Sequence, residues 1–270
     1  MAFSEIERRG LVLLGCGKMG SAMLRGWLAQ GLPASAVWVT DPYPSDWLQA
    51  QGVHLNDPLP ENPAIVLVAV KPQMMQEALP QLSAMGNGST IFLSVAAGTT
   101  IGYYESVLGA QTPVVRAMPN TPAAIGRGIT AIIGNDHAGA DALDLSQSLL
   151  SAVGQVVRLE DEGQMDAVTA VSGSGPAYVF HLIETLAAAG IAQGLSPDLA
   201  MKLAKATVGG AGQLAEDAEE DPAQLRVNVT SPGGTTAAAL NVLMDDASGF
   251  PALLHRAVQA AADRSKELGA

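Results

Sequence analysis

The sequence contains a single cysteine, Cys16, and this scarcity excludes two kinds of site. One thiol cannot form an intramolecular disulfide framework, and it cannot supply a thiolate zinc cluster. The four histidines, His54, His137, His181 and His255, are too scattered along the chain to suggest a metal site. We therefore predict no metal centre and a reducing compartment.

Basic residues are also few, because 14 Lys and Arg stand against 26 Asp and Glu and give a net charge of −12. Nucleic-acid binding relies on basic surfaces that displace counterions, so we expect no nucleic-acid partner. A polybasic membrane patch is excluded for the same reason. No uninterrupted apolar run reaches the roughly 18 residues of a membrane span, and residues 1–10 lack the apolar region of a secretory signal. The expected location is the cytoplasm.

Hydrophobic residues make up 48% of the 270 residues, which is enough for one large domain or two modest ones. Before about residue 160, short apolar runs alternate with helical patterns, which is typical of a parallel sheet covered on both faces. The predicted strands are 11–14, 36–40, 64–70, 89–95, 114–117, 129–133 and 155–159, and the predicted helices are 19–30, 45–51, 74–84, 101–108 and 138–152.

After residue 160 the strand patterns stop, and Ala- and Leu-rich helical patterns take over. The pattern from residue 162 is apolar nearly all round, and such a helix must be buried. We expect a partner subunit to cover it, with a central helix inside its own domain as the alternative. The predicted fold is an α/β Rossmann-type parallel-sheet domain (residues 1–160) followed by an all-α C-terminal dimerisation domain (residues 161–270). The predicted helices of this second domain are 162–194, 197–220, 222–229, 236–244 and 251–268.

A glycine-rich motif, Gly-Cys-Gly-Lys-Met-Gly, links the first predicted strand to a helical pattern. This is the G-x-G-x-x-G pattern in the setting of a dinucleotide-binding loop. Its first glycine permits the tight turn, its second lets a pyrophosphate approach the backbone, and its third allows close helix–strand packing. The helix N-terminus adds free N–H groups for the phosphates. A purely structural turn is the alternative. The predicted cofactor contacts are Gly15, Cys16, Gly17, Lys18, Met19 and Gly20.

Asp41 ends the second predicted strand, 21 residues after Gly20. This is the expected place for an acid that binds the ribose 2′-hydroxyl. A carboxylate there would repel the 2′-phosphate of NADP, and no Lys or Arg follows before Lys71. The pattern favours NADH over NADPH as the form of the NAD(P)H cofactor, unless Asp41 merely starts a turn.

Three further loops follow predicted strands, and ligands of such sheets bind beyond the carboxyl ends of the strands. The loops are 70–72, 96–98 and 118–122. Ala96 and Ala97 in the second loop are small and would let a flat ring lie close. Asn120 in the third offers amide donors near a nicotinamide. The alternatives to cofactor binding are that Lys71 contacts backbone carbonyls and that Asn120 only stabilises a turn. The predicted cofactor contacts are Val70, Lys71 and Pro72, then Ala96 and Ala97, then Met118 and Asn120.

The helical half contains two motifs punctuated by glycine. Residues 172–178 include Pro176, which should kink a helix or start a new one. Residues 231–236 read Ser-Pro-Gly-Gly-Thr-Thr and precede a helical pattern. Glycines and hydroxyls before a helix N-terminus form a nest of N–H donors that suits a small carboxylate. A helix cap made by Ser231 or Thr235 is an alternative compatible with this role.

Neither motif contains a histidine or an acid, and neither does the segment 118–122. Oxidation of an alcohol needs a base for the hydroxyl proton. Reduction of a C=N bond is less demanding, because an imine takes a proton from solvent and the iminium then accepts hydride. The residues therefore favour an imino-acid substrate over a hydroxy acid.

The chain resembles the pyrroline-5-carboxylate reductases over nearly its whole length. The Ser-Pro-Gly-Gly-x-Thr segment before a helix is the most diagnostic motif, and the glycine loop is the least. The motifs that follow the family's order and spacing are 15–20, 70–72, 96–98, 118–122, 172–178 and 231–236.

The resemblance implies reduction of 1-pyrroline-5-carboxylate to L-proline by NAD(P)H, the last step of proline biosynthesis. It also implies a helical domain that interleaves with a second subunit as a homodimer, often within a ring of dimers. By this similarity Ser231, Gly233, Gly234 and Thr235 hold the substrate carboxylate, and Thr236 is the catalytic residue that donates a hydrogen bond to the ring nitrogen. Asp41 departs from the more neutral residues common in the family's ribose pocket.

Two other functions remain open at this point. The β-hydroxyacid dehydrogenases share the architecture but place a catalytic lysine shortly after a Gly-x-Gly in the interdomain helix. Val179 stands at that position here, and the next lysine is Lys202. The second alternative is a dinucleotide-sensing protein without catalysis. Turnover of 1-pyrroline-5-carboxylate, and none of 3-hydroxyacids, would distinguish the three.

Overall fold

The computed structural model describes residues 3–269. The chain divides into two compact units, each of which is described by itself. The first comprises the residues up to Gly173 together with those from Ala262 onward, and the second comprises Ser174–Ala261. The first unit therefore extends beyond the boundary expected near residue 160 and includes the end of the last helix.

The segment after residue 160 belongs to the first unit because its side chains pack and bond there. Met165 and Ala170 are buried, and the Asp166 carboxylate accepts a 2.6 Å hydrogen bond from the Ser265 hydroxyl. A change from strand to helix patterns along a sequence does not reveal which unit a helix packs against. The limits of the two functional domains thus stay a prediction.

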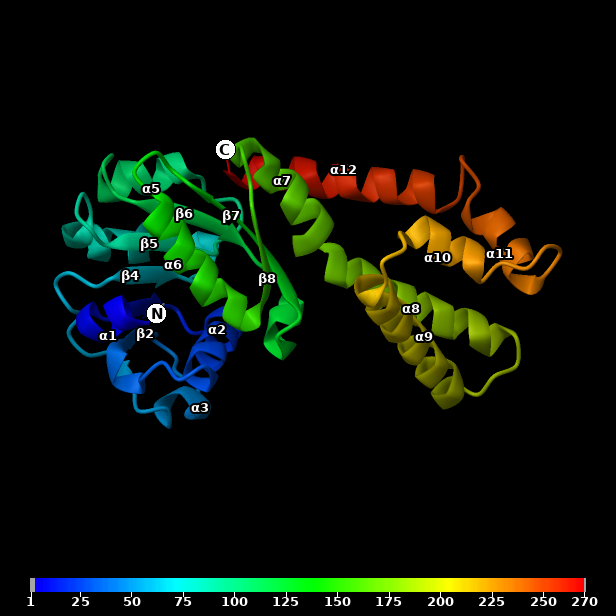
Figure 1. Cartoon of the computed structure of the whole chain (residues 1–270), viewed down its shortest axis with the longest axis horizontal. Helices are drawn as coiled ribbons and strands as arrows, with labels where there is room; N and C mark the ends of the chain where they lie inside the picture. Colours follow the sequence, from blue (N-terminus) through cyan, green and yellow to red (C-terminus); the bar gives the residue numbers. More distant parts are fainter. Residues whose placement is uncertain (1–2, 270) are drawn as a thin grey trace. The chain divides into compact units, whose positions relative to one another are not determined.

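Within residues 3–269 the first unit is built on one eight-stranded sheet (Figure 1). Its strands are β1 (Leu11–Leu14), β2 (Val37–Thr40), β3 (His54–Leu55), β4 (Ile65–Val68), β5 (Ile91–Ser94), β6 (Val114–Met118), β7 (Gly128–Gly134) and β8 (Gly154–Arg158). The spatial order is β3-β2-β1-β4-β5-β6-β7-β8. Neighbouring strands are parallel except for β6 and β7, which are antiparallel. A short turn at Thr121–Ile125 joins these two strands without a crossover helix, so the chain returns in the opposite direction.

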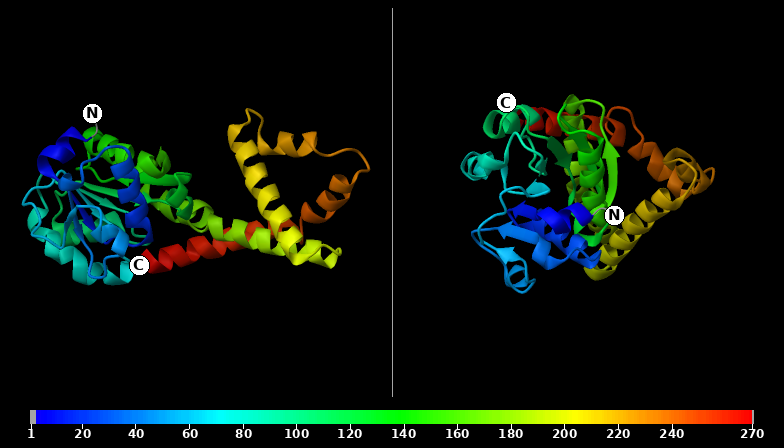
Figure 2. Two further views of the ribbon diagram at one scale, coloured as in Figure 1. Left: turned by 90° about the horizontal axis from the view of Figure 1, so that it is seen from below. Right: turned by 60° about the vertical axis from the view of Figure 1, so that its left-hand side comes forward.

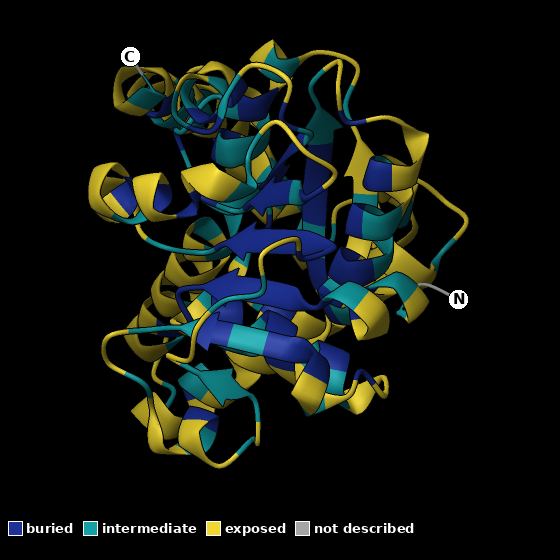
Figure 3. Ribbon diagram, turned by 90° about the vertical axis from the view of Figure 1, so that its left-hand side faces the viewer, coloured by how far each residue is buried: buried dark blue, intermediate teal, exposed yellow. Residues whose placement is uncertain are grey.

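Alternate residues of the central strands face hydrophobic cores on opposite sides of the sheet. Leu11 and Leu13 of β1 lie in one core, and Val12 and Leu14 lie in the other, as the two-residue period of a strand requires. Figure 3 shows the buried strands among helices whose outer faces are exposed. One core is covered by α1 (Ser4–Arg9), α2 (Lys18–Ala29), α3 (Asp46–Gln49) and α6 (Ala140–Leu150), and the other by α4 (Met75–Ala78) and α5 (Ile101–Leu108).

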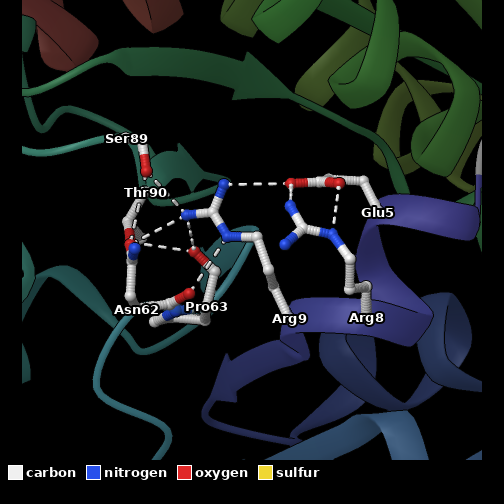
Figure 4. A network of polar contacts seen from close by, with 7 residues as sticks. All are labelled: Glu5, Arg8, Arg9, Asn62, Pro63, Ser89 and Thr90. Atoms are coloured by element: carbon white, nitrogen blue, oxygen red, sulfur yellow. Dashed lines mark hydrogen bonds and ion pairs between the residues drawn. The ribbon is translucent and has the colours of Figure 1, made fainter.

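The sequence pattern predicts neither the two-residue strand β3 nor the charged helix α1. Arg9 fixes α1 by donating hydrogen bonds to the Asn62 side chain at 2.8 Å, the Pro63 carbonyl at 2.9 Å and the Ser89 hydroxyl at 2.9 Å. It also pairs with Glu5 at 3.2 Å (Figure 4). These contacts join α1 to the segments that lead into β4 and β5. They stabilise the end of the sheet opposite the carboxyl ends of its parallel strands.

The described part of the second unit is helical, as predicted. Helices α8 (Gly175–Ala192) and α9 (Pro197–Asp217) pack against each other; they are the yellow-green and yellow helices of Figure 2. Ala187, Ala200 and Ala204 are buried between them. Pro176 lies in the first turn of α8, after a π-helical stretch at Thr169–Gly173, so the prediction that it starts a new helix is confirmed. The remaining helices are α7 (Met165–Val168) in the first unit, α10 (Pro222–Asn228) and α11 (Thr235–Leu243) in the second, and α12 (Phe250–Gly269), which begins in the second and ends in the first.

Much of the apolar surface of the second unit is exposed. Phe180 is 58% exposed, Leu214 is 56% exposed and Val242 is 70% exposed. Apolar surface on this scale marks an interaction site in a folded protein. The helices of this unit therefore need a further covering layer.

Candidate cofactor and substrate sites

The carboxyl ends of five strands meet at one edge of the sheet. Leu14 at the end of β1 lies beside Thr40 of β2 and Val68 of β4. Val68 in turn lies beside Ser94 of β5, and Ser94 lies beside Arg116 of β6. The strand order changes direction between β1 and β4, which is where ligands bind in open α/β sheets. All the predicted cofactor loops follow these five strands.

Two glycines of the first loop are required by packing within the chain. Gly15 has φ +88°, and a Cβ there would come within 3.0 Å of the Ala69 carbonyl oxygen and the Val70 side chain. Gly20 lies in α2, and a Cβ there would overlap with the Gly15 carbonyl oxygen. These contacts bring the loop, α2 and the end of β4 together.

Gly17 differs from these two glycines because a Cβ there would meet no protein atom within 4 Å. It is the N-cap of α2 and supplies no side chain to the free N–H groups of the first turn. Lys18 and Met19 follow in that turn, with Lys18 exposed. An open helix N-terminus lined by backbone N–H groups is the kind of feature that accommodates a pyrophosphate.

The Asp41 carboxylate faces the glycine loop. Its Oδ2 accepts a 2.7 Å hydrogen bond from the Cys16 N–H, and its Oδ1 accepts a 2.8 Å bond from the Tyr43 N–H. Burial, and secondly the Asp41 charge, raise the pKa of the Cys16 thiol to about 11. The thiol is therefore protonated and serves as a small buried group beside the cofactor loop.

Sequence reasoning missed Asn56, which holds Asp41 in place. The Asn56 side chain accepts a 2.9 Å bond from the Asp41 N–H and donates a 2.9 Å bond to the Asp41 carbonyl. Its backbone has φ +54°, a left-handed conformation that Asn tolerates better than most residues. A lone asparagine directly after a two-residue strand gives no signal of this role in a single sequence.

The other predicted cofactor residues lie at the same edge. Lys71 and Pro72 are exposed beyond β4, Ala96 is buried beyond β5, and Ala97 is partly buried. Met118 ends β6 and packs closely against Gly173: a Cβ added at Gly173 would lie only 2.5 Å from the Met118 Cε.

Asn120 has the turn role that the sequence left open. Its Oδ1 accepts a 3.0 Å bond from the Ile129 N–H and ties the loop to β7. This bond uses the acceptor end of the amide and leaves the Nδ2 donors for a ligand. Turn chemistry and ligand binding are therefore compatible at this residue.

The predicted substrate loop lies in the second unit and ends at the start of α11. Pro232 and Gly233 occupy the centre of a turn closed by a 3.0 Å bond from the Gly234 N–H to the Ser231 carbonyl. Gly233 has φ +69°, as glycine in a type II turn does. The N-cap of α11 is Gly234, without a side-chain cap, so the structure contradicts the alternative in which Ser231 or Thr235 caps the helix.

The start of α11 contrasts with the starts of α9 and α10, the two helices that precede it. Ser196 caps α9 through a hydrogen bond to Leu199, and Asp221 caps α10 through a bond to Gln224. The first N–H groups of α11 have no such acceptor and are available to an anion. Ser231 and Thr235 are exposed beside them, and Thr236 follows in the first turn.

Two parts of the chain match known protein families. Residues 162–268 match the family described as pyrroline-5-carboxylate reductase dimerisation. Residues 10–98 match the family described as NADP oxidoreductase coenzyme F420-dependent. The pyrroline-5-carboxylate reductase of Pseudomonas aeruginosa is 39% identical over 264 residues, which cover 96% of each chain. The chain belongs to the pyrroline-5-carboxylate reductase family. The resemblance inferred from the sequence motifs is thereby confirmed.

Solved structures of the family share the fold. A pyrroline-5-carboxylate reductase from Coxiella burnetii is 33% identical with a TM-score of 0.90, covering 97% of this chain and 99% of that one. The Plasmodium falciparum enzyme, solved with NADP bound, is 29% identical with a TM-score of 0.85, covering 98% and 99%. The exposed apolar residues of the second unit lie in the family's dimerisation region, which supports self-association.

Residues 3–269 contain neither a metal-binding cluster nor a membrane-spanning helix. No group of three or more His, Cys, Asp or Glu side chains is arranged to hold a metal ion. No helix among these residues is both long enough and apolar enough to cross a membrane.

Proposed function

We propose that this protein reduces 1-pyrroline-5-carboxylate to L-proline with a reduced nicotinamide cofactor, as the last step of proline biosynthesis. The observation on which this rests is 39% identity to a reductase of that name over 96% of both chains. The geometry of the two candidate sites supports the same reaction, because one fits a dinucleotide and the other fits a small carboxylate.

The cofactor is assigned to the carboxyl edge of the sheet. The open start of α2 at Gly17 would hold the pyrophosphate through N–H groups of the loop and the first turn. Ala96 and Ala97, together with Met118 and Asn120, would flank the nicotinamide, and Val70, Lys71 and Pro72 would border the site. The bound cofactor supplies the hydride.

NADH is the proposed form. Each oxygen of the Asp41 carboxylate already accepts one hydrogen bond from a backbone N–H. The remaining lone pairs can accept hydrogen bonds from the ribose hydroxyls. The same negative charge opposes a 2′-phosphate. Arg25, the basic residue that precedes this segment, stacks its guanidinium over the Trp47 ring at 3.6 Å from the centroid.

The substrate is assigned to the start of α11. The free backbone N–H groups around Gly233 and Gly234 and the hydroxyls of Ser231 and Thr235 would bind its carboxylate, while the Gly234 N–H itself closes the turn to the Ser231 carbonyl. Thr236, one residue further into the helix, would donate a hydrogen bond to the ring nitrogen. A carboxylate at a helix N-terminus is favoured by both the free N–H groups and the helix dipole.

The chemistry needs no ionisable catalyst. The imine nitrogen takes a proton from solvent, which makes the adjacent carbon electron-poor. Thr236 would orient the ring by its hydrogen bond to nitrogen, and the carboxylate site would fix the other end of the substrate. Positioning of this kind, together with directed dipoles, accounts for large rate effects in enzymes.

Self-association is proposed to form a homodimer through the second unit, and dimers are proposed to assemble into a ring. The exposed side chains of Phe180, Leu214 and Val242 would be buried in the dimer. We place the enzyme in the cytoplasm, where its reduced cofactor is regenerated, and assign it no nucleic-acid or membrane partner.

Steady-state assays of the purified full chain test the function. We expect oxidation of NADH or NADPH with 1-pyrroline-5-carboxylate, L-proline as the product, and no turnover of 3-hydroxyacids with the oxidised cofactor. Cofactor binding without turnover would favour a sensing role and contradict the proposal. Turnover of a 3-hydroxyacid alone would favour a β-hydroxyacid dehydrogenase.

A further inference from the structure

The loop of residues 95–100, between β5 and α5, is fixed at its first end by two buried hydroxyls. The Ser94 hydroxyl accepts a 3.2 Å hydrogen bond from the Ala96 N–H. It also shares a short hydrogen bond with the Tyr104 hydroxyl. Ser94 is 1% exposed and Tyr104 is 0% exposed. A buried phenol that bonds the residue before a loop fixes the direction in which that loop leaves its strand.

A partly buried ion pair fixes the far end of the same loop. Glu162 Oε1 accepts a 2.9 Å bond from the N–H of Ile101, the first residue of α5. The same oxygen accepts a 2.7 Å bond from Arg116 of β6. The Arg116 side chain is 6% exposed and that of Glu162 is 32% exposed. Loss of the carboxylate would leave a buried guanidinium without this partner, which is strongly unfavourable.

The middle of the loop contacts the end of α12. Gly98 has φ +75°, and a Cβ there would lie 3.1 Å from the Leu268 Cβ. The loop is thus restrained from three segments that are far apart in sequence, and all of them belong to the first unit.

We propose that Tyr104 and Glu162 are positioning residues for the cofactor, which act by fixing the backbone of loop 95–100. The proposal rests on the proposed contact of Ala96 and Ala97 with the nicotinamide. Tyr104 is fully buried, and the proposal requires no contact between either side chain and the cofactor. Their effect passes through the Ala96 N–H at one end of the loop and the Ile101 N–H at the other.

The state of the phenol supports a permanent restraint. Burial raises the pKa of Tyr104 to about 12, against the smaller opposing effect of its hydrogen bonds to Ser94 and Thr99. The hydroxyl therefore remains protonated throughout the working range of an enzyme, and the hydrogen bond to Ser94 does not switch with pH.

Two variants test the proposal, each with a matched control in the same unit. Tyr104→Phe removes the buried hydroxyl, and Tyr103→Phe makes the same change in the neighbouring, partly buried tyrosine. Glu162→Gln removes the charge opposite Arg116. Asp144→Asn removes the charge from an exposed ion pair with Arg158, in which the side chains are 66% and 42% exposed.

We expect both test variants to raise the Kd for NADH about tenfold, equivalent to about 1.4 kcal/mol, with an unchanged KM for 1-pyrroline-5-carboxylate. Both controls should match the parent enzyme. In the cofactor-free test variants, amide hydrogen exchange at residues 95–101 should accelerate by a similar factor, while exchange in β1 stays constant. If Glu162→Gln does not fold, Glu162→Asp and Ser94→Ala take its place, with smaller increases of the same kind expected.

Ala97→Leu separates this proposal from the cofactor assignment. If Ala97→Leu weakens NADH binding but the test variants only lower the unfolding temperature, Tyr104 and Glu162 have a structural role and the positioning proposal is overturned. If Ala97→Leu leaves the NADH Kd unchanged, the loop does not contact the cofactor, and both assignments fail.

Discussion

The two glycines Gly17 and Gly20 offer the sharpest test of the cofactor loop, because the same added methyl group should have opposite consequences at each. At Gly17 a Cβ meets no protein atom within 4 Å. At Gly20 it would lie closer to the Gly15 carbonyl oxygen than the 3.0 Å that Cβ atoms keep from other atoms. We therefore expect Gly17→Ala to affect the ligand and Gly20→Ala to affect the fold.

The magnitudes follow from the contacts. Gly17→Ala should change the free energy of unfolding by less than about 1 kcal/mol, because its φ and ψ suit alanine and the effects at an N-cap are small. If the methyl group displaces the pyrophosphate from two charge-assisted hydrogen bonds, of about 1.5–3 kcal/mol each, the Kd for NADH should rise by at least about 100-fold. Gly20→Ala forces the loop to shift and should cost a net of about 1–2 kcal/mol after the helix propensity of alanine is included.

The assays are cofactor titration and thermal unfolding of the full chain. The unfolding temperature should fall by roughly 2–8 °C for Gly20→Ala and remain near the parent value for Gly17→Ala. Gly102→Ala is the control, because Gly102 lies in α5 and a Cβ there also meets nothing. Unchanged NADH affinity in Gly17→Ala would refute the pyrophosphate cradle, and unchanged stability in Gly20→Ala would refute the packing of α2 against the loop.

Three further predictions concern the chemistry, the cofactor and pH. Thr236→Ala should lower kcat about 100-fold without changing the NADH Kd, and Thr236→Ser should restore much of the rate; an undiminished kcat in Thr236→Ala would remove this hydroxyl from the reaction. Asp41→Ser should raise the ratio of kcat/KM for NADPH over NADH at least about tenfold, since it removes a repulsive charge, and steady-state kinetics with both cofactors would reveal a contrary result. Because the pKa of Cys16 is raised from 9.0 to about 11 in the native protein, the unfolded thiol ionises first, so the contribution of Cys16 to stability should be lost as the pH rises from about 9 to about 11. Urea unfolding across this range should show a shallower decline for Cys16→Ala, and equal slopes would contradict the shift.

The regular elements of this chain could be predicted where local signals are strong. Residues 11–14 and 101–108 have the bounds that the sequence pattern predicts, and in the structure Thr100 caps the second element and Gly109 ends it. Residues 74–84 were predicted as one helix, but α4 has only four residues and is flanked by 3₁₀ turns. Pro80 lies in the second of these turns, and proline does not continue a helix.

The meeting of the candidate cofactor loops at one edge of the sheet could be predicted, because the rule behind it is topological. Parallel strands bring their carboxyl ends together, so loops that follow successive strands meet at one edge. Asn56 and Glu162 escaped prediction, because each acts on a residue far away in sequence, Asp41 in one case and Arg116 in the other. No periodicity or spacing records such pairings in a single sequence.

Helix α12 has a practical consequence for dissecting this enzyme. This 20-residue helix begins in the second unit and ends in the first. There Leu268 lies against Gly98, and the Ser265 hydroxyl donates a hydrogen bond to Asp166. A fragment that stops after the last strand would lack this cover and expose the backbone beneath it. The first unit is therefore discontinuous in sequence, and only a fragment that rejoins residues 262–269 to it, or the intact chain, preserves its surface.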